Sequence, residues 1–599
     1  MLHLAKELFS LLTPSQRRRY LSLQVMVFFM AIMELLGIAS IAPFMALVAD
    51  VQLLETNTTL KKIYLASGVE SHEKFLFLTG SIVLIMLSTA SILSIITTWR
   101  LSLFALSVGT EIGDRLYRYY LNKDWLFHAS GSSAQLTKQI ATEALRVTNF
   151  IILPLIQMNA RLVLALFIIV GIFIYNPLIA IIGVTLFICG YVVIYKVIRK
   201  RIARYGQHVS TTSTDRFRLM NEGFGGIKDV LLYNRRQDFI DQFEMSGKVL
   251  AHAQGVNTAL SQVPRYLMEL LAFGALITLV LVLLIANNGT LSQVLPVLAI
   301  YALAGFKLLP ALQQIYASVT TVRGNTAAFE AIKADLLASL TLDEQSKADL
   351  QSNDFQYIKK IKLDNVSFTY PNKMSPALNN INIEIPVNAT IGFVGESGSG
   401  KSTLIDLLLG LIEPSQGALM LDNKTIGSNN KHAWQQRIGF VPQSIFLSEG
   451  SIAENIAFGL NKKDIDIEKV QQAVKYSHLE SLVNSLPQGL NTKVGERGIQ
   501  LSGGQRQRIG IARALYNQAD VLVFDEATSA LDGITEKVIM DAIQELSGQK
   551  TIVMIAHRLK TVQKCDVIYF IEQGRVVDQG TYQQLIDSNP KFKKMAEHA

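Results

Sequence analysis

The sequence predicts a multi-domain protein, in which an all-α domain of six membrane-spanning helices precedes an α/β domain with a phosphate-binding P-loop. Three observations support this prediction. Long runs of the first half are almost free of charge, the second half alternates short β-rich runs with helical ones, and a glycine-rich loop ending in Lys-Ser follows one apolar run. We place the membrane domain at 1–340, a polar linker at 341–354 and the α/β domain at 355–599.

The composition is an average over an apolar half and a polar half. Of the 599 residues, 50% are hydrophobic and 17% are charged, and the mean hydropathy is +0.29. The net charge of +8 is concentrated beside the apolar runs of the first half, so we expect no nucleic-acid partner. The two cysteines can form no disulfide framework, and no Cys/His cluster has zinc spacing.

Six runs are long and apolar enough to cross a bilayer, which takes about 20 residues. The second run has no charged side chain, and turn signals at Asn176-Pro177 and Asn287-Asn288-Gly289 split two longer apolar stretches into helical hairpins. The runs cover approximately Leu21–Ala49, Phe75–Trp99, Val147–Tyr175, Pro177–Val197, Tyr266–Asn287 and Ser292–Val319.

Basic residues in the connections predict the orientation. Arg17–Arg19 precede the first run and many Lys and Arg lie between the fourth and fifth, whereas the two hairpin turns have none. We expect an integral, multi-pass membrane protein with both termini cytoplasmic. The connections Arg100–Arg146 and Ile198–Arg265 are too long for simple loops. We interpret them as cytoplasmic helical extensions ending in short transverse helices that could dock on the second domain, ordinary surface helices being the alternative.

Two shorter segments also have helical patterns. Residues 1–12 suit an amphipathic helix lying in the membrane interface, although a soluble amphipathic helix has the same pattern. The outward segment Asp50–Lys74 has apolar residues at helical spacing, which indicates a short external helix. A glycine-rich break at Gly223–Lys228 interrupts the second long extension.

The segment Gly395–Ser402 reads Gly-Glu-Ser-Gly-Ser-Gly-Lys-Ser, between a predicted buried strand at 391–394 and a predicted helix at 404–411. In this context the loop amides and the helix N-terminus face the phosphates of a nucleotide. Lys401 reaches the β- and γ-phosphates, and the Ser402 hydroxyl coordinates Mg²⁺. A merely flexible glycine loop is the alternative.

A second apolar strand, Val521–Phe524, ends in the carboxylates Asp525 and Glu526. Asp525 is suited to hold Mg²⁺, and Glu526 is placed to orient or deprotonate an attacking water. Paired carboxylates at a strand end could instead be merely solvated.

With these motifs in place, residues of about 355–599 resemble the nucleotide-binding domain of an ABC transporter. Tyr370 matches the aromatic residue that stacks on adenine, and Gln443 the glutamine that senses Mg²⁺ and water. Leu501–Gln505 matches the signature, Ser529–Asp532 the dimer-facing turn, and His557 the histidine at the γ-phosphate.

The resemblance implies ATP and Mg²⁺ as cofactors and assigns residues to each role. The catalytic residues are Glu526, His557 and Gln443. The Mg²⁺ ligands are Ser402, Gln443 and Asp525. The residues that bind ATP are Tyr370, Gly395, Glu396, Ser397, Gly398, Ser399, Gly400, Lys401, Ser402, Thr403, Ser502, Gly503, Gly504, Gln505 and Asp532. In this family the signature completes the ATP site of the other subunit, so the resemblance implies a homodimer with two complete sites.

Six spans before the ATPase resemble the exporter-type, type IV half-transporter, which implies a translocase of the bacterial cytoplasmic (inner) membrane. Charged residues inside spans mark a substrate pathway by default. Arg161 also lies inside a predicted span and Arg265 lies near the end of one, and snorkelling to the interface is the alternative for both. The predicted pathway residues are Glu34, Arg265, Glu269 and Lys307.

Stretches around these residues are similar to the PglK-type flippase of lipid-linked oligosaccharides, and the segment Asp50–Lys74 matches that family's external helix. One departure is the second span, which lacks that family's arginine. We therefore expect ATP-driven flipping of a polyprenyl-pyrophosphate-linked oligosaccharide, with a lipid-linked substrate and the bilayer as partners. The alternative is a general lipid (lipid A-like) or multidrug exporter, and a different class is an ATP-gated membrane regulator or channel.

Overall fold

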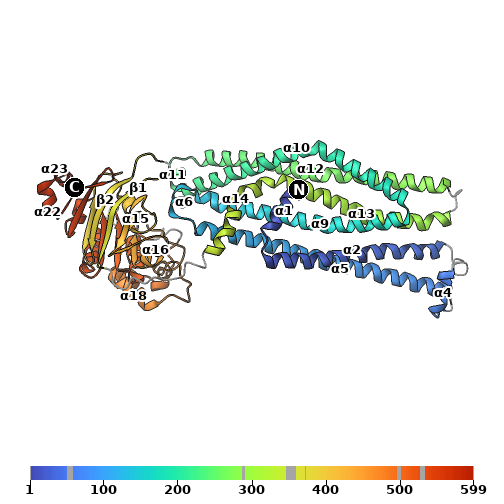
Figure 1. Cartoon of the computed structure of the whole chain (residues 1–599), viewed down its shortest axis with the longest axis horizontal. Coiled ribbons are helices and arrows are strands. Elements are labelled where there is room, and N and C mark those ends of the chain that lie inside the picture. Colours follow the sequence, from blue (N-terminus) through green and yellow to red (C-terminus); the bar gives the residue numbers. More distant parts are fainter. Residues whose placement is uncertain are drawn as a thin grey trace. The chain divides into compact units, whose positions relative to one another are not determined.

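The computed structural model (Figure 1) describes residues 2–49, 58–69, 71–286, 291–345, 359–371, 373–495, 501–526, 533–556 and 558–597. They form two compact units. The first comprises Met1–Lys123 and Ser130–Gln345, and the second comprises Asp124–Ala129 and Ser346–Ala599. The last helix of the first unit ends at Gln345, five residues into the predicted linker, because 341–345 continue with residues that favour a helix.

The first unit is entirely helical within its described residues. Its elements are α1 (Leu2–Ser10), α2 (Pro14–Ala49), α4 (Thr58–Ala66), α5 (His72–Leu121), α7 (Ser133–Lys138), η1 (Gln139–Glu143), α8 (Ala144–Val147), η2 (Thr148–Ile152), α9 (Leu153–Tyr175), α10 (Pro177–Gly225), α11 (Ile227–Leu232), α12 (Arg236–Ala286), α13 (Leu291–Gly324) and α14 (Thr326–Gln345).

Five of the described helices are long and apolar enough to cross a membrane, and α10 makes six if its two segments, bent by 43°, count as one span. The turn predicted at Asn176-Pro177 is confirmed, since α9 ends at Tyr175 and α10 begins at Pro177. The second predicted turn, 287–289, lies outside the described residues.

The predicted helical extensions are confirmed as continuations of the spans. The helices α5, α10 and α12 contain 50, 49 and 51 residues. At about 1.5 Å per residue each is roughly 75 Å long, over twice the ~30 Å hydrocarbon core. The glycine-rich break is also confirmed, because α10 ends at Gly225 and the short α11 follows.

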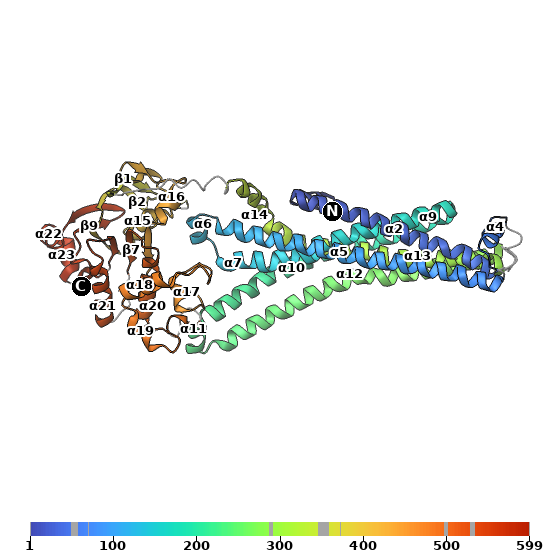
Figure 2. The ribbon, with the colours of Figure 1, turned by 90° about the horizontal axis from the view of Figure 1, so that it is seen from below.

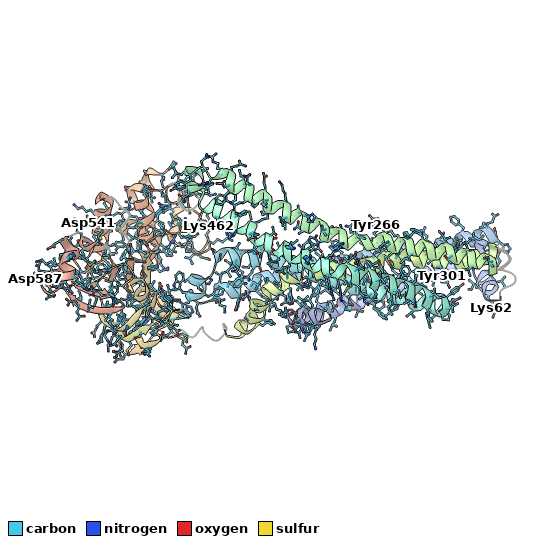
Figure 3. The ribbon with its side chains drawn as sticks, turned by 90° about the horizontal axis from the view of Figure 1, so that it is seen from above. Lys62, Tyr266, Tyr301, Lys462, Asp541 and Asp587 are labelled. Atoms are coloured by element: carbon cyan, nitrogen blue, oxygen red, sulfur yellow. The ribbon has the colours of Figure 1, made fainter. Side chains whose placement is uncertain are left out.

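The short helix predicted between the first two spans is confirmed as α4, and its external side stays a prediction (Figure 3). Lys62 of α4 lies at the same end of the helical unit as Tyr301 of α13, whereas Tyr266 of α12 lies farther along the bundle. This end of the unit also carries the turn between α9 and α10, and the Tyr301 ring lies 6.2 Å from that of Tyr175.

Small residues allow α2, α9 and α13 to approach one another closely. Their shared core contains Ala31 of α2, Ala165 and Ile168 of α9, and Ala304 and Ala311 of α13. Packing of this kind is typical of membrane helices, where contact between backbones replaces the hydrophobic effect. In Figures 1 and 2, α10 and α12 run side by side, and they are in extensive contact.

The second unit contains two sheets. The six-stranded sheet has the order β10-β9-β3-β8-β7-β6, with β9, β3, β8, β7 and β6 parallel, and an antiparallel four-stranded sheet has the order β2-β1-β4-β5. The strands are β1 (Lys360–Phe368), β2 (Leu378–Pro386), β3 (Thr390–Val394), β4 (Gln416–Leu421), β5 (Lys424–Thr425), β6 (Ile438–Val441), β7 (Val521–Asp525), β8 (Thr551–Ile555), β9 (Val567–Glu572) and β10 (Arg575–Gly580).

Helices cover the sheets and build a separate helical subdomain. α17, α18, α19 and α20 share a core that includes Val470, Ile509 and Ala512. The helices of this unit are α6 (Trp125–Ser130), α15 (Lys401–Leu408), α16 (Lys431–Gln435), α17 (Ile452–Ile456), α18 (Ile467–Tyr476), α19 (Glu480–Ser485), η3 (Gly489–Asn491), α20 (Gly503–Tyr516), α21 (Gly533–Glu545), η5 (Leu559–Val562), α22 (Tyr582–Ser588) and α23 (Pro590–Glu597).

Candidate functional site

Four adjacent parallel strands end at one edge of the larger sheet, and the predicted ATP-handling residues follow them there. The P-loop follows β3, Gln443 follows β6, and Asp525 and Glu526 end β7. The strands β3, β8, β7 and β6 are neighbours in this order, so their carboxyl ends bring these segments together. His557, which follows β8, and Asp532 lie outside the described residues.

Glycines allow the P-loop to turn tightly onto α15. Gly398 and Gly400 have φ angles of 80° and 104°, a region that residues with a Cβ avoid. A Cβ at Gly400 would lie 2.7 Å from the carbonyl oxygen of Ala377. The loop therefore accepts only glycine at this position, and its shape presents backbone N–H groups at the start of α15, as an anion requires.

Lys401 is a buried cation held by carbonyl oxygens. Its side chain is 5% exposed, and its Nζ donates to the carbonyl oxygens of Gly395 and Glu396, at 2.8 Å each. Burial lowers the pKa of the Lys401 ammonium, an effect that Glu526 and Asp525 oppose through their charges. Within the described chain Lys401 has no carboxylate in ion-pair contact, so the loop fits a phosphate group that would supply the missing negative charge.

Gln443 and Glu526 are in direct contact. The Gln443 amide donates to the Glu526 carboxylate at 2.7 Å, because β6 and β7 pair in register up to Val441 and Phe524. Glu526 itself has φ 49°, and its N–H donates to the carbonyl oxygen of Ile555 at 3.3 Å. A left-handed conformation at a residue other than glycine is strained and typical of functional sites, and this strain holds Glu526 beyond the end of the strand.

The residues present could hold Mg²⁺ only together with a phosphate. No group of three or more His, Cys, Asp or Glu within the described ranges is arranged to hold a metal ion. A site built from the Ser402 hydroxyl, the Asp525 carboxylate and the Gln443 amide has a single negative charge, so phosphate oxygens would complete it. The assignment of Ser402, Gln443 and Asp525 to Mg²⁺ stays a prediction.

Tyr370 lies beside the start of α15. Its hydroxyl is 3.1 Å from Oγ1 of Thr403, and its ring packs edge-on against Phe368 with centroids 5.0 Å apart. Lys373 lies 5.9 Å from the ring centroid. The ring is thus held next to the phosphate-binding loop, a position that suits the stacking role predicted for it.

The signature lies at the start of α20, a helix of the helical subdomain. Ser502 caps α20 in a reciprocal arrangement, in which the Gln505 N–H donates to the Ser502 hydroxyl and the Ser502 N–H donates to the Gln505 side chain. Gly503 and Gly504 form the first turn, where free N–H groups attract an anion. α20 packs within the helical subdomain, whereas the P-loop helix α15 packs on the sheets.

The segment Asp124–Ala129 belongs to the unit of the sheets although its neighbours in sequence belong to the helical unit. The indole N–H of Trp125 donates to the Asp406 carboxylate at 3.3 Å, and Leu126 packs against the core beneath α15. Burial raises the pKa of Asp406, the bond from Trp125 lowers it, and Asp525 raises it again. The docking of a transverse helix is thereby confirmed for α6, on the helix that begins with Lys401.

Two ion pairs in the helical unit contain the predicted pathway residues. Lys307 of α13 lies 2.9 Å from Glu34 of α2, which also accepts a hydrogen bond from Ser94 of α5 at 2.8 Å. Arg265 lies 2.8 Å from Glu269, one turn along α12. The structure thus joins all four predicted residues into two pairs of opposite charge. The spacing in the sequence could predict only the second pair, Arg265 with Glu269.

Arg161 is placed differently from these four residues. The sequence allowed it either a role in the substrate pathway or snorkelling to the interface. It lies on α9 in the same helical stripe as Ala165 and Ile168, four and seven residues later, which pack against α2 and α13. It forms no ion pair with a described residue, and one turn before it Gln157 accepts a hydrogen bond from Gln314 at 3.4 Å. The helical spacing in the sequence could have shown that Arg161 shares a face with Ala165 and Ile168 and not with the lipid-facing residues of this span.

Comparison with known proteins identifies the family. Residues 26–306 match the transmembrane region of ABC transporters, and residues 378–529 match the ABC transporter family itself. An ATP-dependent lipid A-core flippase of Cupriavidus pinatubonensis is 30% identical over 500 residues, which cover 82% of each chain. The chain belongs to the ABC transporter family. It has the exporter arrangement, binds ATP and couples ATP hydrolysis to transport.

Other similar proteins agree with this assignment. An ATP-dependent lipid A-core flippase of Yersinia pestis is 32% identical over 392 residues, 65% of this chain and 66% of that protein. The structure of a bacterial Atm1-family ABC exporter with ATP bound has a TM-score of 0.76 at 20% identity, over 97% of this chain and 98% of the other. This last similarity extends the shared fold over both units.

Because α6 reaches the P-loop helix, we expect Trp125→Ala to uncouple this exporter. Loss of the bond to Asp406 should lower transport by about tenfold, the effect of one hydrogen bond to a charged group. The ATPase motifs are untouched, so basal hydrolysis should stay within about twofold. The ratio of substrate moved to ATP hydrolysed in proteoliposomes measures the effect. Trp125→Phe retains the ring without the N–H, and an unchanged ratio in both variants would contradict the role.

Proposed function

We propose that this ABC exporter works as a homodimer and flips a phosphate-bearing glycolipid of the lipid A type across the cytoplasmic (inner) membrane of a bacterium. The curated relatives at 30% and 32% identity bear the name of lipid A-core flippases, which supports the substrate class. Both termini are proposed to be cytoplasmic, from the basic residues at Arg17–Arg19 and along α10.

The proposed chemistry belongs to the edge of the larger sheet. Ser402, Asp525 and Gln443 would hold Mg²⁺, which would offset the charge of the phosphates, and Glu526 would orient or deprotonate the attacking water. His557, which comes shortly after β8 in the sequence, has the role at the γ-phosphate that the resemblance assigns to it. ATP supplies the phosphoanhydride bond whose hydrolysis drives the cycle.

Dimerisation completes this site. The signature of one chain closes on the P-loop of its partner, as the resemblance to the family implies for Ser502 and Lys401. Tyr370 stacks on adenine and Asp532 faces the dimer interface in the same proposal.

The observation that carries the substrate class is Arg161. A cation within an apolar span is costly unless an anion compensates it. Lys307 and Arg265 have their own carboxylates, at 2.9 Å and 2.8 Å, whereas Arg161 is in no ion pair within the described chain. A substrate phosphate would compensate Arg161, with the amides of Gln157 and Gln314 beside it.

The ion pairs of Lys307 and Arg265 give these two cations another proposed role. A phosphate that reached Lys307 would have to displace Glu34, and the carboxylate released would need a proton or another cation. We therefore place Lys307 and Arg265 later in the pathway than Arg161, at steps where helices α2, α12 and α13 shift relative to one another.

The second candidate is a flippase of polyprenyl-pyrophosphate-linked oligosaccharide. The helix α4 favours it, since the sequence resemblance assigns an external helix at this position to that class. Both candidates carry phosphate on a lipid, so Arg161 serves either one. They differ in the lipid, because lipid A has several acyl chains on its sugars whereas the second substrate has one polyprenyl chain.

The test is a flipping assay in proteoliposomes with fluorescent lipid A-type glycolipid, fluorescent polyprenyl-pyrophosphate oligosaccharide and a zwitterionic phospholipid. Arg161→Gln should slow flipping of the phosphorylated glycolipid by about 10- to 100-fold, since a hydrogen bond to a charged group contributes about 1.5–3 kcal/mol. Arg161→Lys should restore much of the rate.

The controls separate substrate binding from ATP hydrolysis. Arg218→Gln removes another cation of this unit, one that pairs with Glu222 on an exposed face of α10, and should leave flipping unchanged. Basal ATPase activity should persist in every variant. Equal rates for wild type and Arg161→Gln on both phosphorylated substrates would overturn the assignment.

A further inference from the structure

The N-terminal helix α1 is fastened to the first unit by two contacts, one in its C-terminal half and one just after its last residue. Lys333 of α14 lies 2.7 Å from Glu7, and the Arg115 guanidinium of α5 donates to the carbonyl oxygen of Leu11 at 3.0 Å. Figure 1 shows α1 as a short helix near the N-terminus, before α2. An interfacial helix held only by the bilayer would need neither contact, so α1 is a fixed wall of the transporter.

Behind this wall lies a cavity of about 280 Å³ between α1, α2, α5 and the η2–α9 segment. This volume is near the lower end of ligand pockets, which begin at about 300 Å³. Its lining is mostly apolar and comes from several helices, as shown by Ala5, Leu8, Val108, Ile112 and Leu162. Apolar walls hold water poorly, whereas an alkyl chain fits them.

The few polar groups of the cavity are already engaged. Gln16 donates to the Glu111 carboxylate, and Asn159 donates to Gln24 and to the Tyr20 hydroxyl. Arg115, one turn after Glu111 on α5, donates to the carbonyl oxygen of Leu11. A polar or charged ligand would find little inside this cavity, so its occupant should be hydrocarbon.

Three basic residues lie at the start of α2, close in sequence to the lining residues Gln16 and Tyr20. The Arg17 guanidinium lies 5.5 Å from the ring centroid of Phe9, a lining residue, and Arg18 and Arg19 are exposed on the same turn of α2. These arginines mark the change from polar to apolar sequence, which is the depth of lipid headgroups. A lipid with its chain in the cavity would therefore have its phosphate at the depth of these arginines, with Arg17 the nearest to a lining residue.

We propose that this cavity is a binding site for one acyl chain of an anionic bilayer phospholipid, whose headgroup is held by Arg17–Arg19. The site is separate from the ATP site and from Arg161, and it does not depend on which substrate is flipped. The bound chain fills the space between α1 and the spans and so fixes the start of α2. The lipid acts as a resident component of the transporter rather than as its cargo.

The test uses phosphatidylglycerol that carries a photoreactive diazirine within one acyl chain, in nanodiscs that contain the full-length exporter. Label should concentrate on peptides of α1 and of the facing parts of α5 and α9. Ala5→Trp and Val108→Phe fill the cavity from opposite walls, and each should lower this labelling by about tenfold. Val193→Trp, at a 63% exposed position of α10, is the matched control and should leave it unchanged.

Headgroup recognition has its own measurement. Arg18→Gln and Arg19→Gln should each lower labelling by phosphatidylglycerol about fivefold, and neither should affect a phosphatidylcholine probe with the same diazirine. Labelling spread evenly over lipid-facing peptides of the wild type would overturn the site, as would equal labelling of wild type and both filling variants. Equal labelling by the two lipids would overturn the preference for an anionic headgroup.

Discussion

Replacement of Glu526 by Gln is expected to lower ATP turnover by about 10²- to 10⁴-fold, the usual contribution of a general base. Glu526 ends β7 beyond Asp525, with its backbone fixed by Ile555 and its carboxylate in contact with Gln443 at 2.7 Å. The substituted amide has the same size and can still accept a hydrogen bond from Gln443. The change therefore removes the proposed base and keeps the size of the side chain.

ATP binding should survive this substitution, since Lys401 and the P-loop are unchanged. We expect the variant to accumulate as an ATP-bound closed dimer, and phosphate release together with binding of a fluorescent ATP analogue would show both effects. Glu480→Gln, on the exposed first turn of α19, is the matched control and should keep full activity. ATP turnover in Glu526→Gln near that of this control would remove Glu526 from the catalytic role.

The sequence could predict the fold because each element has a local signal. The apolar length of the spans, the Asn176-Pro177 turn and the P-loop between a buried strand and a helix do not depend on distant contacts. The lengths of α5 and α12 were harder to predict. The apolar and polar parts of each form one continuous helix, because the backbone stays helical where its surroundings change from lipid to water.

The candidate sites could be predicted only in part, because pairing across helices is not local. Nothing in the spacing of Glu34 and Lys307 shows that their charges meet, since 273 positions separate them and only the packing of α2 on α13 brings them to 2.9 Å. The same holds for Trp125 and Asp406, which lie in different halves of the chain. By contrast, Arg265 and Glu269 are one helical turn apart, and their pairing follows from the sequence.

The second large effect concerns the proposed sharing of each ATP site between two chains. Lys401→Ala removes the buried cation of the P-loop, and Ser502→Arg blocks the start of α20. In a mixed dimer of these two variants, shared sites would put both lesions into one site and leave the other intact. Such dimers should retain a large fraction of one site's turnover, whereas each variant alone should lose about 10²-fold or more.

The reciprocal mixture decides between shared and separate sites. A chain with both Lys401→Ala and Ser502→Arg, paired with a wild-type chain, has one lesion in each site if the sites are shared, so its turnover should be low. If each chain formed its own site, the wild-type chain of the reciprocal mixture would stay active, and the first mixture would have no ATP turnover. Both dimers are isolated through two different affinity tags, and their rates of phosphate release are compared in nanodiscs. Sharing requires that the first mixture be the faster one, because only there does an intact P-loop meet an intact Ser502 across the interface.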